Sequence, residues 1–156
     1  MPRRGNVPKR KIEDDPIFGS VTLHKFVNKI MYDGKKSKAE KIIYSALEIV
    51  GQKLNKDPLE VFVKALDNVT PLLEVKARRV GGATYQVPLE VTRARGQAIG
   101  MQWLREAARE RKGHSMIENL SAEIIDACGG TGGAMKKKED LHKTAEANKA
   151  FAHFRW

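Results

Sequence analysis

The glycine pair Gly81–Gly82 constrains the fold of this 156-residue chain more strongly than any other feature. It separates two β-favouring runs in the stretch VKARRVGGATYQVPLEV, residues 75–91. Two glycines between such runs are typical of a two-residue hairpin turn, because glycine accepts the positive φ angles that this turn needs. A two-residue turn also fixes the strand register. The predicted pairs are Val80 with Ala83, Arg79 with Thr84, Arg78 with Tyr85, and Lys76 with Val87.

The predicted hairpin, residues 75–88, has no clean apolar face. One face carries Lys76, Arg78, Tyr85 and Val87, and the other carries Ala77, Arg79, Thr84 and Gln86. Because an isolated two-stranded ribbon is marginally stable in water, we expect this one to project from the fold and to be steadied by a partner. Arginines beside a tyrosine suit phosphate contacts and stacking on unpaired bases. The alternative is a hairpin packed along the rest of the fold, with solvated basic residues.

The rest of the chain shows helical periodicity of its apolar residues, together with helix start and stop signals. With 41% hydrophobic residues, the chain can build a core. The sequence predicts a mainly α fold, one domain over residues 1–156, with about six helices and a projecting two-stranded hairpin arm. The predicted helical segments run from Ser20 to Asp33, from a capping box at Ser37–Glu40 to Gly51, from the N-cap Asp57 to Thr70, from about Thr92 to Lys112, from a capping box at Ser115–Glu118 to Gly129, and from about Gly133 to Asn148.

The charge balance points to a polyanionic partner. The chain has 29 Lys and Arg against 19 Asp and Glu, a formal net charge of +10, and such an excess is typical of proteins that bind nucleic acid or an anionic surface. Residues 1–15 form a predicted flexible basic arm, because they have little to pack. The basic residues of this arm are Arg3, Arg4, Lys9, Arg10 and Lys11.

Further basic residues fall within the predicted helices. Lys35, Lys36 and Lys38 surround the start of the second helix, and Lys136 lies in the last one. Arg95, Arg105 and Arg109 share one face of the long helix. That face suits a phosphate backbone, but it is equally consistent with a solvated face whose arginines pair with Glu106 and Glu110.

The sequence offers no catalytic or metal-binding motif. The four histidines lack zinc spacing, and the single cysteine, Cys128, has no disulfide partner. The glycine-rich stretch GGTGGAMKKK lacks the P-loop pattern and follows no predicted strand. No apolar run reaches the length of a membrane span, and no secretory signal is present. We therefore expect a cytoplasmic protein that is not an enzyme, with no cofactor, no metal and no membrane partner.

Three motifs carry a specific resemblance: DGKKSKAEKI (residues 33–42), PLLEVKARRVGGATYQVPLEV (71–91) and AEANKAFAHFRW (145–156). They resemble the bacterial form of the seventh small-subunit ribosomal protein family, and the likeness covers essentially the whole chain. The resemblance implies a primary binder of 16S rRNA that nucleates assembly of the small-subunit head. It also implies a position at the subunit interface near the decoding centre, with the hairpin near exit-site tRNA and mRNA, and with small-subunit proteins nine and eleven as neighbours.

The resemblance also assigns residues. It places Lys76, Arg78, Arg79, Gly81, Gly82 and Tyr85 in the hairpin arm. It implies that the basic arm, together with Lys35, Lys36 and Lys38, contacts ribosomal RNA. Relatives often read V-R-P-x-R-R after the hairpin, where this chain has Val91–Gly96. Thr92 can cap the helix in place of the proline, and Arg95 is the safest RNA contact there. Three alternatives stay open: a helix-turn-helix DNA-binding regulator, an autoregulatory binder of its own operon mRNA, and an RNA-modifying enzyme.

Overall fold

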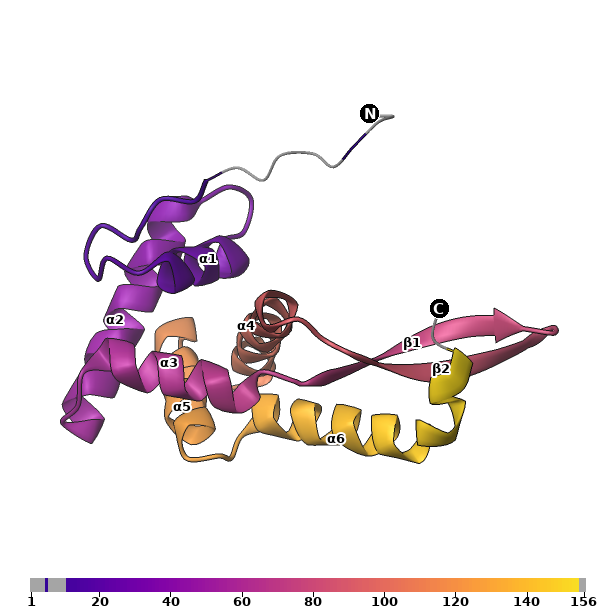
Figure 1. Ribbon diagram of the computed structural model, residues 1–156. Helices are drawn as coiled ribbons and strands as arrows, with labels where there is room; N and C mark the ends of the chain where they lie inside the picture. Colours follow the sequence, from indigo (N-terminus) through magenta and orange to yellow (C-terminus); the bar gives the residue numbers. More distant parts are fainter. Residues whose placement is uncertain (1–4, 6–10, 155–156) are drawn as a thin grey trace.

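Helices dominate the structure, a computed structural model that describes residue 5 and residues 11–154. The predicted basic residues Arg3, Arg4, Lys9 and Arg10 lie outside the described residues. Figure 1 shows the order of elements, which confirms the predicted mainly α class with one antiparallel hairpin. The elements are α1 (Val21–Ile30), α2 (Lys36–Leu54), α3 (Pro58–Val69), β1 (Leu73–Val80), β2 (Ala83–Glu90), α4 (Arg93–Glu110), α5 (Met116–Cys128), α6 (Gly133–Ala147) and a C-terminal 3-10 helix η1 (Lys149–Phe154).

Most helix starts follow the local sequence signals. The Ser20 hydroxyl accepts a hydrogen bond from Leu23 N, and the Asp57 carboxylate accepts from the backbone at the start of α3. The capping box between Ser115 and Glu118 is present at α5. Thr92 is the N-cap of α4, although its side chain makes no capping hydrogen bond. At α1, α3 and α5, polar side chains thus satisfy free N–H groups at the helix start.

The capping box predicted at Ser37–Glu40 is wrong. Helix α2 begins at Lys36, with Lys35 as an N-cap that makes no side-chain hydrogen bond. The cause is the preceding turn, in which Asp33 and Gly34 both adopt positive φ angles, 51° and 71°. This turn lets Lys35 N donate to Tyr32 O, so the helix starts before the serine.

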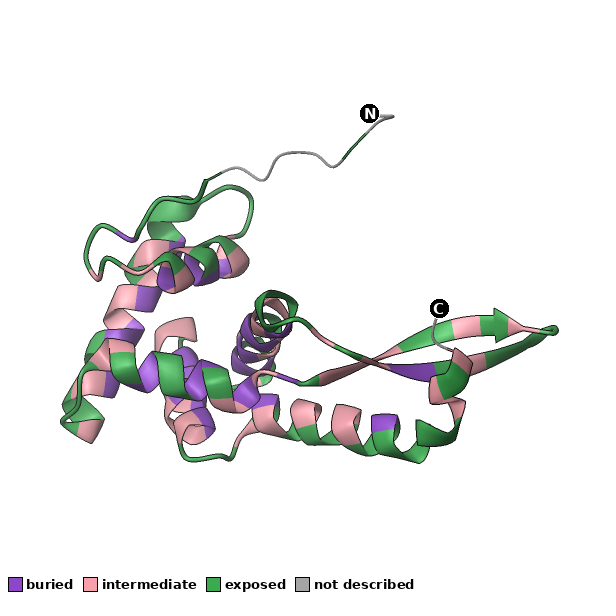
Figure 2. Ribbon diagram, viewed as in Figure 1, coloured by how far each residue is buried: buried purple, intermediate pink, exposed green. Residues whose placement is uncertain are grey.

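The hydrophobic core lies between α1, α2, α3, α4 and α5. Phe26 of α1 and Phe62 of α3 are fully buried, with ring centroids 5.0 Å apart. Leu47, Leu104 and Ile124 contribute from the other three helices. Each such side chain stabilises the fold by roughly 1.5–3 kcal/mol. Figure 2 shows these buried residues gathered in the helical part of the molecule, with the ribbon mostly outside it.

A close approach of α4 to the end of α3 positions the base of the hairpin. A Cβ on Gly96 would lie 2.9 Å from Pro71 O and 3.0 Å from Thr70 Cγ2, too near for any side chain. Glycine therefore lets the first turn of α4 pass directly over the segment that leads into β1. Val91 N also donates to Leu72 O, which closes the ribbon at this end.

The hairpin has the predicted register at all four predicted pairs. Gly81 and Gly82 adopt φ angles of 57° and 89°, as a two-residue turn requires. The ribbon extends away from helices α1–α5, while α6 runs alongside it and η1 packs against β2 (Figure 1). The sequence predicted neither the packing of α6 along the ribbon nor η1.

Candidate nucleic-acid interface

The two faces of the ribbon have different environments. On the inner face, Val87 is fully buried and the ring of Tyr85 lies 5.1 Å from the rings of both Phe151 and Phe154 of η1. On the outer face, Arg79 and Thr84 are exposed. Tyr85 and Arg79 thus lie on opposite faces, so the structure does not bring the predicted stacking ring and this arginine together. Lys76 and Arg78 lie on the inner face with Tyr85, and Arg79 is the exposed arginine of the outer face.

An ion-pair group holds the base of the ribbon. Glu74 Oε2 accepts from Arg95 Nε at 2.7 Å, and Glu74 Oε1 lies 3.4 Å from Lys76 Nζ. Burial alone would raise the pKa of Glu74, but the two cations outweigh it and hold the pKa below its ordinary value. Lys76 and Arg95, both predicted RNA contacts, are therefore paired with a carboxylate of the chain itself, although both side chains stay largely exposed.

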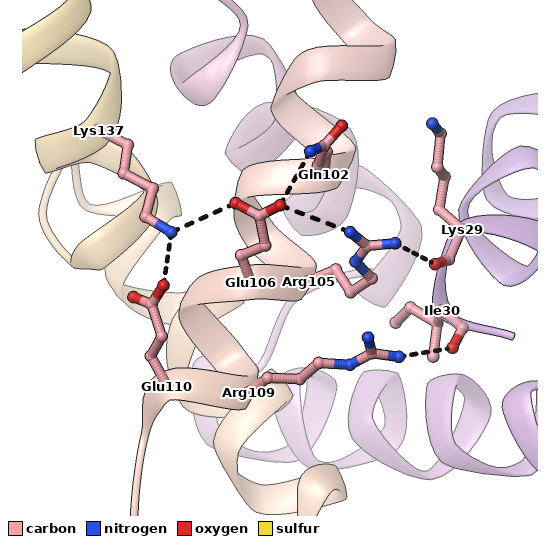
Figure 3. A network of polar contacts seen from close by, with 8 residues as sticks. All are labelled: Lys29, Ile30, Gln102, Arg105, Glu106, Arg109, Glu110 and Lys137. Atoms are coloured by element: carbon pink, nitrogen blue, oxygen red, sulfur yellow. Dashed lines mark hydrogen bonds and ion pairs between the residues drawn. The ribbon is translucent and has the colours of Figure 1, made fainter. Parts of the chain in front are cut away.

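Two further arginines of α4, Arg105 and Arg109, connect that helix to α1. Arg105 Nη1 donates to Lys29 O at 3.3 Å, and Arg109 Nη2 donates to Ile30 O at 3.2 Å (Figure 3). These carbonyls are at the C-terminal end of α1, where backbone oxygens lack partners within the helix. The observed geometry favours the internal role for Arg105, which is half-buried, while Arg109 remains exposed.

Glu106 joins α4 to α6 in the same network. Its carboxylate accepts from Gln102 at 2.9 Å and lies 3.4 Å from Lys137 Nζ, which also donates to Glu110 at 2.7 Å (Figure 3). Burial would lower the pKa of Lys137, but Glu110 and Glu106 outweigh it and raise the pKa. Its neighbour Lys136, the predicted contact in α6, is exposed.

The turn between α1 and α2 presents a cationic surface with an apolar floor. Lys35, Lys36 and Lys38 are all exposed, and Tyr32 is 70% exposed. Lys36 pairs with Glu40 at 3.7 Å. A cavity of about 310 Å³ opens here and has no acidic residue in its lining. The lining residues are Ile30, Tyr32, Lys35, Lys38, Ala39, Ile42, Arg109 and Met116.

The glycine-rich segment before α6 is closed to phosphate. Glu123, 1% exposed, accepts from Ala134 N at 2.8 Å, so a carboxylate of the chain itself occupies the N-terminus of α6. Arg111 pairs with Glu123 and with Asp126 and neutralises the buried charge. The structure therefore agrees with the sequence in giving no nucleotide site here. Nor does the described part of the chain contain any cluster of three metal-ligating side chains.

Three further side chains were not singled out from the sequence. Asp15, interpreted only as local charge balance, is buried, caps Ile17 N and Phe18 N, and accepts from the Tyr44 hydroxyl at 2.7 Å. Lys25 and Lys29 were also missed, although their spacing of four residues places them on one face of α1. Lys11, the described member of the basic arm, is exposed.

The comparisons with known proteins agree with these features. A family model described as ribosomal protein S7p/S5e matches residues 2–149. Relatives named small ribosomal subunit protein uS7 match over all 156 residues and the whole of their own length: 60% identical in Caldanaerobacter subterraneus subsp. tengcongensis, 61% in Carboxydothermus hydrogenoformans and 59% in Dictyoglomus thermophilum. These matches confirm the resemblance based on the three motifs. Within the described residues, no helix is long and apolar enough to span a bilayer.

Proposed function

We propose that this chain, which belongs to the ribosomal protein S7p/S5e family and is a component of the small ribosomal subunit, is a primary binder of 16S rRNA. As a member of that family it is a structural protein of translation and not an enzyme. Residues 1–156 would act as one RNA-binding domain that nucleates assembly of the subunit head.

The observation that supports the proposal best is that some basic side chains have partners within the chain, whereas others do not. The arginines of α4 contact carboxylates or carbonyls of the chain itself. By contrast, Lys35 and Lys38 at the α1–α2 turn and Arg79 on the ribbon are exposed, and in the part of the chain that the structure describes no carboxylate pairs with them. A cavity lined by lysines, an arginine and a tyrosine, without any acidic group, suits RNA phosphates and an unstacked base.

Binding would follow from charge and shape together. Lys and Arg groups displace counterions from phosphates, so affinity falls steeply with salt. The basic residues Arg3, Arg4, Lys9, Arg10 and Lys11 would add charges to the same interface. The helical body would recognise the folded shape of an RNA junction, because the deep groove of A-form RNA hides base edges from side chains.

The outer face of the ribbon would contact exit-site tRNA and mRNA at the subunit interface, close to the decoding centre. Arg79 and the turn at Gly81–Gly82 are exposed at the end of the ribbon, where they are open to a partner. Small-subunit proteins nine and eleven would be the protein neighbours.

A salt series tests this proposal. Purified protein is mixed with the 3′ major-domain fragment of 16S rRNA, or with duplex DNA of equal charge, in a filter-binding assay. RNA binding that persists at salt concentrations where DNA binding is lost supports shape-specific recognition. If affinity for both nucleic acids falls equally with salt, the chain binds as a general polycation, and the proposal is contradicted.

A further inference from the structure

The turn between α1 and α2 contains a chemically reactive dipeptide, Asp33–Gly34. Lys35 N donates to Tyr32 O at 3.0 Å, so residues 32–35 form a β-turn, and its two central residues have φ angles of 51° and 71°. Glycine adopts such angles freely, whereas a residue with a side chain is strained there. Asp33 is also the only aspartate of the sequence that is followed by glycine.

Both reactive groups of this dipeptide are free. Asp33 and Gly34 are exposed, and a Cβ added to Gly34 would meet nothing within 4 Å. In the part of the chain that the structure describes, the Asp33 carboxylate forms no ion pair or hydrogen bond, and Gly34 N donates to no acceptor. The carboxyl carbon of Asp33 is therefore open to attack by the next backbone nitrogen, a reaction within the chain that needs no second molecule.

The other aspartates of the chain lack this combination. Proline, which has no N–H group, follows Asp15 and Asp57. Within α3, α5 and α6, backbone hydrogen bonds hold the nitrogen that follows each aspartate there. Asp14 is exposed outside any helix, like Asp33, but the next residue carries a side chain that restricts ring closure.

Ring closure requires rotation about the Cα–C bond of Asp33, so the turn has to open. The hydrogen bond that closes the turn lies on an exposed segment, and Tyr32 is 70% exposed, so no core packing opposes opening. Helix α2 begins at Lys36, after the turn, and stays intact. Opening also releases the strain of the positive φ angle at Asp33.

We propose that Asp33–Gly34 is a modification site at which the folded protein forms isoaspartate, and that the product is a substrate for a protein isoaspartate methyltransferase. In the first step Gly34 N bonds to Cγ of Asp33, and the nitrogen proton leaves with the carboxyl hydroxyl as water. The succinimide then takes up water at the α-carbonyl of Asp33, which breaks the original peptide bond. The main chain now runs through Cγ, and the α-carboxylate of residue 33 is free.

That carboxylate is the group that would be methylated. Its oxygen attacks the methyl group of S-adenosylmethionine, and the sulfonium leaves as a neutral thioether, so the step needs no oxidant or reductant. The inference does not depend on the proposed function, because both steps at Asp33 use groups of the chain and water alone.

Isoaspartate changes the structure of the turn, because it lengthens the main chain by one methylene group. The Lys35 N to Tyr32 O hydrogen bond no longer closes a β-turn of ordinary size. Lys35 O accepts from Ala39 N in the first turn of α2, so a displaced Lys35 alters the start of that helix. Tyr32 and Lys35 also line the cavity at the α1–α2 turn, whose shape would change with them.

Incubation of the folded, full-length protein tests the proposal. The protein is held for days in neutral and in mildly acidic buffer, and isoaspartate is measured by methyl transfer from radiolabelled S-adenosylmethionine with a purified isoaspartate methyltransferase. Electron-transfer fragmentation of the tryptic peptide of residues 30–35 locates the modification. We expect isoaspartate at residue 33, with the larger yield in acidic buffer, because a neutral carboxyl group loses water more readily than a carboxylate. Peptides with the other aspartates should show about tenfold less.

Matched variants separate the outcomes. Asp33→Glu should lose the methyl transfer, because the longer side chain would have to close a larger ring, and Asp14→Glu should leave it unchanged. Asp33→Asn should form isoaspartate faster, because an amide loses ammonia more readily than a carboxyl group loses water. Circular dichroism shows whether each variant is folded.

Two results would overturn the proposal. Isoaspartate at residue 33 only after unfolding in urea would show that the folded turn protects the dipeptide. Equal yields at Asp33 and Asp14 would show that the turn adds nothing to the reaction. Isoaspartate at residue 33 without methyl transfer would overturn the assignment of the methyltransferase.

Discussion

The ring of Tyr85 on β2 lies 5.1 Å from the ring of Phe151 in η1, which joins the last turn of the chain to the middle of the ribbon. Phe154 lies at the same distance from Tyr85, so two aromatic rings of η1 pack against the tyrosine. Such pairs contribute about 0.5–1.5 kcal/mol each beyond the area that they bury. The ribbon is therefore stabilised from within the chain, before any partner binds.

Tyr85→Ala should loosen η1 from the ribbon and leave the helical core intact. We expect faster hydrogen exchange at the β1 and β2 amides and at η1, with unchanged exchange in α3 and α5, whose core contacts do not involve this ring. Thr84→Ala, on the opposite face, is the matched control. If both variants exchange alike, the aromatic contact contributes nothing to the ribbon.

Arg79→Ala should weaken RNA binding without changing stability. Because the residue is exposed on the outer face, we expect its free energy of unfolding in urea to stay within about 0.5 kcal/mol of that of the parent. The salt slope of binding to the 16S fragment should fall by roughly one. Lys56→Ala, exposed in the turn between α2 and α3, should leave the slope unchanged. An unchanged salt slope for Arg79→Ala would show that Arg79 of the ribbon does not contact RNA phosphates.

Glu123→Gln should destabilise the protein strongly. Glu123 is 1% exposed and accepts from Arg111 Nε at 2.8 Å and from Ala134 N at 2.8 Å, so the change leaves Arg111 without its buried counter-charge. Breaking such a pair costs about 3 kcal/mol or more. Asp126→Asn removes the other, more exposed partner of Arg111 and should cost less than about 1 kcal/mol. Urea unfolding measures both, and equal losses would contradict the importance of burial here.

His142 should make stability depend on pH in the mildly acidic range. Its Nε2 accepts from Leu72 N at 3.3 Å at the base of the ribbon. Burial, and then the charge of Lys138, lower the pKa of His142 below its ordinary value of 6.5. The folded state thus keeps the imidazole neutral, while the unfolded chain takes up a proton as the pH falls. The contribution of neutral His142 to the free energy of unfolding is fully present above about pH 6.5. It is lost as the pH falls below that value towards the folded-state pKa.

The His142→Gln variant should therefore lose less stability than the parent between about pH 7.5 and 5.5. Unfolding in urea at three pH values in this range measures the difference. His114→Gln is the control, because His114 precedes α5 and is exposed. A parent profile as flat as that of His142→Gln would show that this histidine does not titrate differently on folding.

Local signals in the sequence predicted most of the fold. The hairpin register follows from Gly81–Gly82 alone, and the caps Asp57 and Ser115 mark their helices, because these features depend on neighbours within a few residues. The start of α2 was misplaced because the turn at Asp33 competes with a capping serine, and a periodicity argument does not include that competition.

The candidate interface was harder to predict, because it depends on long-range contacts. Sequence placed Arg105 and Arg109 on one helix face, but only the fold brings the carbonyls of Lys29 and Ile30 to them. The pairing of Tyr85 with η1 likewise joins residues more than sixty positions apart, and no local pattern marks it. Exposed lysines near a turn, by contrast, were predictable, because their exposure follows from local polarity.

Helix α6 connects the helical core to the ribbon. Ala134 near its start is fully buried against the core, and Ala145 near its end is 1% exposed beside the ribbon. The position of the ribbon relative to the helical core is therefore set during folding. If RNA binds both the α1–α2 turn and the ribbon, as proposed, an RNA bound at one surface would meet the other at a high effective concentration, and only an RNA of matching length would gain from both. Under the proposed function, binding would therefore select an RNA by the distance between two of its segments.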